Sequence, residues 1–156
     1  MDQQISALLS QAQSVVVVSH IRPDGDAIGS LLGMGLALLR AGKKVQMVLQ
    51  DGLPEKYSFL PGSQLVLRTI EAPFDTLIVV DCSDLERTGI ILQGQNPPDL
   101  VIDHHKTNLA FGSLNYVEPQ AVATAAILAE KLPVWGLEVD KAVAECLLTG
   151  ILGDTI

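Results

Sequence analysis

Several residue types that mark particular classes of protein are scarce in this chain of 156 residues. The two cysteines, Cys82 and Cys146, lack C-x-x-C spacing, so we expect small buried side chains rather than a structural zinc site. The apolar runs are too short to cross a bilayer, and the first residues lack the basic segment of a secretory signal. These absences predict a cytoplasmic protein with reduced thiols and no membrane partner.

Positive charge is also scarce, because 10 Lys and Arg face 18 Asp and Glu, for a formal net charge of −8. Long nucleic acids are bound through clustered Lys and Arg, so we expect no long nucleic acid partner for this domain alone. Part of the negative charge could belong to acidic ligands of a metal site, where bound cations would offset it. The alternative is that these acidic residues are surface carboxylates that keep the protein soluble. Hydrophobic residues make up 48% of the chain, which excludes a disordered chain and predicts one domain with a real core.

Short apolar runs and helical patterns alternate along the chain. Runs rich in Val and Ile predict buried strands of a parallel sheet. The predicted strands are Val15–Ser19, Val45–Leu49, Leu77–Val80 and Leu100–Ile102, with Leu65–Ile70 and Leu114–Val117 as further candidates. The predicted helices are Gln3–Gln13, Ala27–Ala41, Ala121–Leu132, which Pro133 would close, and Val139–Leu152, with a short helix or loop at Ser83–Leu92. The expected fold class is α/β, a mainly parallel sheet flanked by helices.

Acidic residues and histidines follow three of these strands directly. They are His20, Asp24 and Asp26 after the first strand, Asp81 after a later one, and Asp103-His104-His105 after another. Sites in open α/β sheets form beyond the carboxyl ends of the strands, so we expect these groups to meet at one edge. All three histidines of the chain lie in these segments. Carboxylates and imidazoles gathered there would disfavour one another's charged forms unless something positive, such as a divalent cation, lies between them.

The types of donor narrow the choice of metal. Mixed imidazole and carboxylate ligands suit Mn²⁺, Fe²⁺, Co²⁺ or Zn²⁺ better than a purely oxygen-lined Mg²⁺ site does. Two such ions about 3.5–4 Å apart, sharing a carboxylate, activate water near neutral pH and clamp a phosphoryl group. The helix that begins near Ala27 directs its N-terminal amides toward the same place, which also suits a phosphate. The pattern therefore indicates a metal-dependent hydrolase.

Each of these residues also has an ordinary structural alternative. Asp26 could cap the following helix within an Asx turn, and Asp81 could simply form a turn at the end of its strand. His104 and His105 could lie on a surface loop. Arg22 could contact a phosphate oxygen or remain solvated. The joint occurrence of all these groups after neighbouring strands favours the site over the alternatives taken one by one.

The set His20-x-x-Pro23-Asp24-Gly25-Asp26, Asp81, Asp103-His104-His105 and Asp154 resembles the four motifs of the DHH phosphoesterase superfamily. That superfamily includes RecJ-type exonucleases, nanoRNases that also cleave 3′-phosphoadenosine 5′-phosphate, cyclic-dinucleotide phosphodiesterases, exopolyphosphatases and family II inorganic pyrophosphatases. The motifs occur in order across the chain. Two segments are most similar to the branch of nanoRNases and 3′-phosphoadenosine 5′-phosphate phosphatases. They are the sequence Pro23-Asp24-Gly25-Asp26-Ala27 and the segment from Asp103 to Asn108.

The resemblance implies a role for each matched residue and two divalent cations, first Mn²⁺, with Mg²⁺ or Co²⁺ as alternatives. One metal would be bound by His20, Asp24 and Asp81, and the second by Asp26, Asp81, His104 and Asp154, with Asp81 as the bridge. The catalytic residues would be His105, Asp81 and Asp103, of which Asp103 would orient a histidine or the loop. The resemblance implies that His105 would contact the substrate, and Asn108 matches a position that the family often fills with Asn. Arg22 is a further candidate for contacting the substrate, because of its place on the first loop rather than by the resemblance.

One departure from the family concerns the C-terminal end. Members of the superfamily continue past the fourth motif into a second domain, often with a Gly-rich, His-bearing segment that binds the substrate. This chain has no Gly-Gly-Gly-His and ends on Gly153-Asp154-Thr155-Ile156. We therefore expect residues 1–156 to be a DHH catalytic domain truncated at its C-terminal end, with a substrate-binding domain of the parent protein as its partner. Whether the domain is active alone is left open.

The expected substrate is a short oligonucleotide or a nucleotide, cleaved at a phosphodiester or phosphomonoester bond. Short substrates fit an acidic protein better than long polyanions do. A second hypothesis, also enzymatic, is that the protein is an inorganic pyrophosphatase or exopolyphosphatase. A third hypothesis, from a different class of function, is that it is a non-catalytic module that binds metal or nucleotide.

Overall fold

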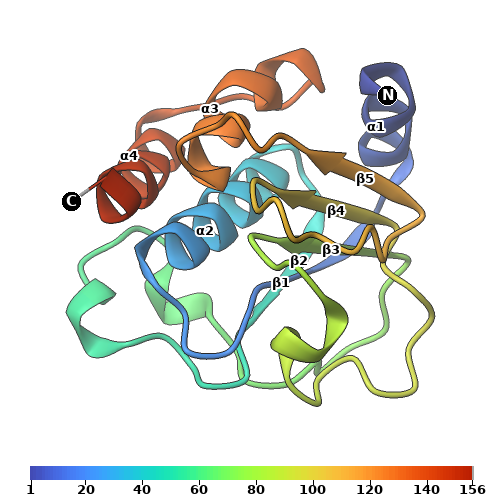
Figure 1. The fold of residues 1–156 in the computed structure, drawn as a ribbon, viewed down its shortest axis with the longest axis horizontal. Coiled ribbons are helices and arrows are strands. Elements are labelled where there is room, and N and C mark those ends of the chain that lie inside the picture. Colours follow the sequence, from blue (N-terminus) through green and yellow to red (C-terminus); the bar gives the residue numbers. More distant parts are fainter. Residues whose placement is uncertain (156) are drawn as a thin grey trace.

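A computed structural model of the chain describes residues 1–155, with side chains described as far as Gly153. This part of the chain forms a five-stranded sheet in the order β2-β1-β3-β4-β5, with every neighbouring pair parallel (Figure 1). The strands are β1 (Ser14–Val18), β2 (Lys44–Val48), β3 (Thr76–Val80), β4 (Leu100–Asp103) and β5 (Leu114–Val117). The predicted α/β class is confirmed, as is the candidate strand at Leu114–Val117.

The helices of the described residues are α1 (Asp2–Gln11), α2 (Gly25–Arg40), α3 (Thr124–Val134) and α4 (Lys141–Thr155). Three short 3₁₀ turns, η1 (Glu55–Tyr57), η2 (Ser63–Leu65) and η3 (Leu85–Thr88), lie in the connections. Figure 1 shows α2, α3 and α4 grouped on one side of the sheet. No helix in the described range combines the length and the apolar character that a bilayer span requires.

The two faces of the sheet are covered differently. Alternate residues of a strand point to opposite faces, so Val15 and Val17 of β1 pack in the core beneath the helices. Val16 and Val18 face the other way, into a smaller apolar cluster. Irregular segments rather than helices cover that second cluster, through Leu67, Ile70, Phe74, Ile91 and Phe111. Burial on both faces explains why the last four residues of β1, Val15 to Val18, are all valines.

Helices α2 and α4 approach closely because small residues lie between them. A Cβ atom added at Gly29 of α2 would lie 2.5 Å from the carbonyl oxygen of Cys146 in α4. A Cβ atom at Gly33 would lie 2.4 Å from a methyl carbon of Leu147. At Gly29 the neighbouring atoms belong to the backbone, so glycine there sets the spacing of the two helices. At Gly33 the neighbour is the end of the Leu147 side chain, which can shift. The same contact brings the C-terminal turn of α4 beside the start of α2, where Gly153 meets Gly25.

Two predictions about secondary structure are wrong. The candidate strand Leu65–Ile70 is not a strand, because only Leu67 bridges the sheet, at Val48 of β2. The side chain of Gln46 accepts hydrogen bonds from the Glu71 and Ala72 amides, so a side chain replaces the ladder that a strand would make there. Pro133 does not close α3, which continues to Val134. Pro133 lacks an N–H donor, but the helical pattern continues past it because the Trp135 amide donates to the carbonyl oxygen of Lys131.

Candidate metal centre

The strand order reverses between β1 and β3, because β2 lies on one side of this pair and β4 on the other. Such a switch point leaves a crevice beyond the carboxyl ends of the two strands. Val18 pairs in register with Val79, so the residues that follow β1 and β3 emerge side by side. His20 and Asp81 are among these residues, and 3.6 Å separates His20 Nε2 from Asp81 Oδ2.

A first group of potential ligands consists of His20, Asp24 and Asp81. One ligand atom of each lies within 4.8 Å of the others. His20 Nε2 is 3.7 Å from Asp24 Oδ1, in addition to its approach to Asp81. The other ring nitrogen of His20 donates to the carbonyl oxygen of Ile21 at 2.6 Å, which fixes the ring with Nε2 toward the carboxylates.

A second group lies on the other side of Asp81. His104 Nε2 is 3.3 Å from Asp26 Oδ2 and 3.6 Å from Asp81 Oδ1. Its Nδ1 donates to the carbonyl oxygen of Ala121 at 3.2 Å, so this ring is also held from behind. The two carboxylate oxygens of Asp81 thus face two different histidines, as a bridging ligand requires. Asp154 lies in the last turn of α4, but its side chain is outside the described residues.

Asp81 has an unusual backbone. Its φ is 56°, in the left-handed region that residues with a Cβ rarely adopt, while its side chain is only 1% exposed. Its amide donates to the carbonyl oxygen of Ile102, which continues the pairing of β3 with β4 by one residue. Strain of this kind persists where the surroundings fix it, and it often marks a functional position. Here the left-handed backbone of Asp81 places its carboxylate between His20 and His104.

The charges of these groups are strongly coupled. Burial, followed by the nearby carboxylates of Asp26 and Asp24, raises the pKa of Asp81 to about 7. Burial opposes the charge of His20, but hydrogen bonds to Asp24 and Asp81 outweigh it and raise the pKa of His20 to about 10. Asp26 raises the pKa of His104 to about 9. Protons on the imidazoles thus supply positive charge that the carboxylates need, and divalent cations would supply the same charge. The donor set fits such ions.

Asp26 and Asp24 each accept hydrogen bonds at the start of a different helix. Asp26 is fully buried and accepts hydrogen bonds from the Thr124 and Ala125 amides, both at 2.9 Å, at the first turn of α3. Asp24, not Asp26, is the N-cap of α2, since it accepts from the Ala27 amide at 2.9 Å. The alternative that Asp26 caps its own helix is therefore wrong. It stabilises the start of a different helix, and Ser30 adds a further hydrogen bond to it.

Asp103, His105 and Asn108 form a separate set of hydrogen bonds beside these two groups. Asp103 is buried, and it accepts from His105 Nδ1 at 2.6 Å and from Asn108 Nδ2 at 2.9 Å. Burial opposes its charge, but these two hydrogen bonds hold the pKa of Asp103 below its usual value. Asn108 also donates to the carbonyl oxygen of Cys82, which ties the loops after β3 and β4 together. The side chain of His105 is 43% exposed, so it is accessible from solvent while its orientation is fixed.

A family model described as the DHH family, N-terminal domain, matches residues 14–151. The chain belongs to the DHH family. Over 144 residues it is 36% identical to a protein of Thermus thermophilus named bifunctional oligoribonuclease and PAP phosphatase NrnA, covering 90% of this chain and 43% of that protein. Over 168 residues it is 26% identical to a probable manganese-dependent inorganic pyrophosphatase of Lactococcus lactis, covering 93% of this chain and 49% of that protein.

Among solved structures, an exopolyphosphatase-related protein from Bacteroides fragilis has the same fold, with a TM-score of 0.87 and 27% identity. The match covers 99% of this chain and 49% of that one. The predicted resemblance to the DHH superfamily is thus confirmed. The chain spans about half the length of these relatives or less.

Sequence reasoning missed one residue in the centre of this DHH-family domain. Thr124, fully buried at the first position of α3, donates its hydroxyl hydrogen to Asp81 Oδ1 at 2.9 Å. It thereby joins Asp81 to the helix that Asp26 caps. The only local signal is a hydroxyl residue within the apolar segment Ala121–Ala126, and that signal is equally typical of a helix start.

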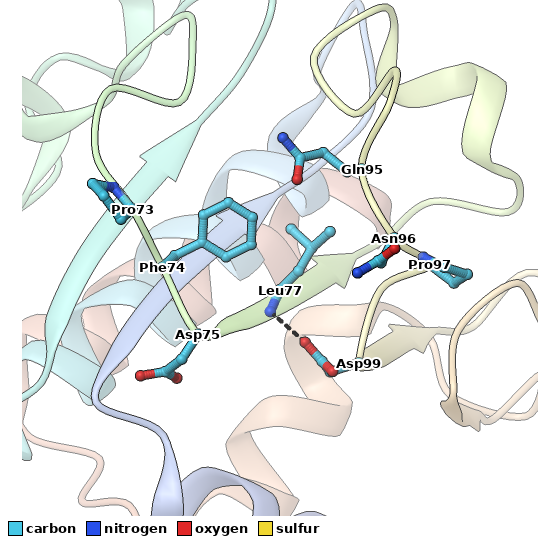
Figure 2. Close-up of a pocket in the computed structure, with 8 residues that line it drawn as sticks. All are labelled: Pro73, Phe74, Asp75, Leu77, Gln95, Asn96, Pro97 and Asp99. Atoms are coloured by element: carbon cyan, nitrogen blue, oxygen red, sulfur yellow. Dashed lines mark hydrogen bonds between the residues drawn. The ribbon is translucent and has the colours of Figure 1, made fainter.

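A cavity at the opposite edge of the sheet has no part in this centre. It measures about 360 Å³ and lies at the amino ends of β3 and β4. Figure 2 shows Phe74, Leu77 and Gln95 around it, with the Leu77 amide donating to Asp99. Asp75, also at its rim, accepts from the Gln13 and Ser14 amides. Its carboxylates thus bind the backbone at the start of strands, as structural groups do.

Cys82 follows Asp81 but takes no part in the centre of this domain. Its side chain is buried, and its thiol donates to the carbonyl oxygen of Asp84. Burial raises the pKa of Cys82 to about 12, so the reactive thiolate is not formed near neutral pH. Both cysteines are free and buried, as predicted.

Proposed function

We propose that this domain is the catalytic half of a metal-dependent phosphoesterase of the oligoribonuclease or 3′-phosphoadenosine 5′-phosphate phosphatase type. Its substrates would be short oligonucleotides or nucleotides. The observation that carries the proposal is the position of Asp81, with one carboxylate oxygen toward His20 and the other toward His104. Similarity to the Thermus protein named as an oligoribonuclease and PAP phosphatase supports the choice of substrate class.

In this proposal Asp81 would be shared by two sites, each of which would hold one divalent cation. His20 and Asp24 would complete one site, and Asp26, His104 and Asp154 the other. Bound divalent cations supply Lewis-acid chemistry, since they lower the pKa of water and neutralise charge on phosphoryl oxygens. Manganese is the first choice, because imidazole and carboxylate donors are mixed here and one relative is named as manganese-dependent.

Protein groups around the centre would position the phosphate. His105 is proposed to contact a phosphate oxygen through the ring nitrogen that Asp103 does not bind. Asp103 would fix the imidazole and favour its protonated form, because hydrogen bonding to Asp103 raises the pKa of His105. Asn108 would act through Asp103 and the loop rather than by touching substrate, since its amide is bound to Asp103 and Cys82.

The proposal extends to the rest of the parent protein. We propose that residues 1–156 form one catalytic domain and that a second, C-terminal domain of the parent completes the substrate site. The length of the relatives supports this, since their matched regions are about half of each protein. The cytoplasm remains the proposed location.

Hydrolysis of short RNA by the intact protein tests the function. The protein loaded with Mn²⁺ should release mononucleotides from short oligoribonucleotides and phosphate from 3′-phosphoadenosine 5′-phosphate. The same preparation stripped with EDTA should release neither, and added Mn²⁺ should restore both. No turnover of either substrate by protein that elemental analysis shows to hold metal would refute the proposal.

An inorganic pyrophosphatase or exopolyphosphatase is the second candidate, because relatives with those names share the fold or the sequence. The groups around Asp81 would serve either reaction, since both attack a phosphoryl group. Assays with pyrophosphate, polyphosphate and dinucleotides on one preparation separate the two. Higher kcat/KM for pyrophosphate than for every nucleotide would favour this second candidate.

A further inference from the structure

A cavity of about 380 Å³ lies at the same edge of the sheet as the candidate metal centre, between two of the loops that follow strands. Its lining comes from the loop after β1 and the loop after β3, through Ile21, Arg22, Asp84, Glu86 and Arg87. The two loops are joined at this point, because the Ile21 amide donates to the carbonyl oxygen of Arg87 at 2.6 Å. Arg22 lies between His20 and Asp24 in sequence, so one side of the cavity comes from the loop that carries these two potential ligands. We call it the arginine cavity.

The side chains of the two arginines of this cavity have no acidic partner among the residues whose side chains are described. Among the described residues, neither the Arg22 nor the Arg87 side chain makes a hydrogen bond or an ion pair, although Asp84 and Glu86 line the same space. Arg40 behaves differently, since its guanidinium contacts both Glu138 and Asp140 at 3.4 Å. Two guanidiniums that have no carboxylate partner up to Gly153, in a chain of net charge −8, are suited to bind an anion from outside.

The backbone holds both arginines in place. Arg22 has a φ of 51°, and its amide donates to Asp51 Oδ2 at 2.6 Å in the segment after β2. The Arg87 amide donates to Asp84 Oδ1 at 3.0 Å at the start of η3. A residue with a Cβ adopts a positive φ only where its surroundings fix it. The Arg22 backbone is therefore fixed by a contact that does not use its charge, and the guanidinium remains available.

We propose that the arginine cavity binds the phosphate of the substrate that is not cleaved. This inference rests on the proposed function, and it deepens it by naming what the substrate must carry. A nucleoside 3′,5′-bisphosphate or a 5′-phosphorylated dinucleotide has two phosphates, one for the metal centre and one for Arg22 and Arg87. The enzyme would then select substrates with a second phosphate close to the scissile one.

Glu86 gives the proposal a second, opposite consequence. Its carboxylate lines the cavity without pairing with either guanidinium among the described residues, so it lowers the positive potential there. Asp84 cannot be varied as cleanly, because its carboxylate accepts from the Arg87 amide. Replacing Glu86 should strengthen binding of a second phosphate, whereas replacing Arg87 should weaken it.

The test compares a two-phosphate substrate with a one-phosphate substrate on the intact, Mn²⁺-loaded protein. The probes are adenosine 3′,5′-bisphosphate and bis-p-nitrophenyl phosphate. Arg87→Gln should raise KM for the bisphosphate about tenfold more than KM for the one-phosphate ester, since losing a charge-assisted hydrogen bond costs about one factor of ten or more. Glu86→Gln should lower KM for the bisphosphate. Arg40→Gln, with its ion pairs far along α2, is the matched control.

The outcomes separate the subsite from the proposed function. Equal changes in KM for both substrates on Arg87→Gln, or no change on either, would overturn the subsite while the enzyme remains a phosphoesterase. If the unmodified protein cleaves neither substrate, calorimetric titration decides instead. Tighter binding of adenosine 3′,5′-bisphosphate than of 5′-AMP, lost in Arg87→Gln and kept in Arg40→Gln, would support the subsite. Equal affinity for the two nucleotides would overturn it. Metal content, measured on every variant, confirms that the neighbouring ligands are intact.

Discussion

Asp81 combines three demands that few residue types satisfy together. It adopts a φ of 56°, it is almost completely buried, and its two oxygens approach different histidines. Asp and Asn tolerate the left-handed region better than other residues with a Cβ. Only Asp adds the negative charge that the proposed bridge between two cations would require. The backbone and the chemistry of the site thus select the same residue.

Asp81→Asn and Asp81→Ala should separate metal binding from folding. Both variants should lose both cations, because the shared carboxylate is gone. Asp81→Ala should also destabilise the metal-free protein by about 1–2 kcal/mol more than Asp81→Asn, the cost of alanine in the left-handed region. Elemental analysis and urea unfolding in EDTA measure the two effects. A variant that retains two equivalents of metal would contradict the bridging role.

Residues of the site differ in how visible they are in the sequence. His20, Asp24, Asp26 and Asp81 follow strands directly, and this local position is enough to predict that they meet. Thr124 was not predicted, because it joins Asp81 through a hydrogen bond that spans 43 residues of chain. Arg87 and Asp51 were missed for the same reason. Their positions depend on contacts between loops, which no local pattern records.

At the scale of elements, the centre depends on how α2 meets α4. The last turns of α4 lie against the first turn of α2, where a Cβ atom at Gly150 would be 3.5 Å from the Asp26 carboxylate. Helix α4 therefore brings its C-terminal end, which contains Asp154, to the metal centre. Glycines at the contact allow this approach. A wider spacing would move one end of the site relative to the other.

Gly29→Ala and Gly35→Ala test this contact with the same chemical change on one helix. Each gains up to about 1 kcal/mol in helix propensity. At Gly29 the new Cβ would clash with the backbone of α4, which could be relieved only by moving the helix. At Gly35 it would contact the side chain of Met47, which can adopt another rotamer. We expect Gly29→Ala to lower the free energy of unfolding by about 1–3 kcal/mol and to weaken metal binding. Gly35→Ala should cost less and leave metal binding unchanged, as urea unfolding and metal titration will show.

Strands that are buried on both faces could be predicted from the sequence. A segment whose backbone hydrogen bonds are made by a side chain rather than by a neighbouring strand could not. The strands β1, β3 and β4 are buried on both faces, so their apolar runs identify them. The segment Leu65–Ile70 has a similar composition but lies beside the edge strand β2, where one bridge and the Gln46 side chain satisfy its neighbours. Hydrophobicity alone does not distinguish a strand from a covering segment.

At the scale of the whole molecule, an acidic chain places carboxylates and histidines from its loops at one edge of the sheet. The net charge is −8, and Asp26, Asp81, Asp103 and His20 are all buried there. Buried carboxylates repel one another, which lowers the stability of the fold unless positive charge compensates. Bound metal should therefore contribute to folding as well as to chemistry.

Adding Mn²⁺ should raise the melting temperature of the protein, since a ligand that binds only the native state stabilises it by RT ln(1 + [L]/Kd). At a free concentration about one hundred times Kd, the gain is about 2.7 kcal/mol for one site. EDTA should reverse the shift, and Asp81→Asn should abolish it. Ca²⁺ serves as a comparison, because it prefers all-oxygen ligands and should stabilise less at equal concentration. A melting temperature independent of Mn²⁺, or equally raised in Asp81→Asn, would mean that the clustered side chains are not a metal site.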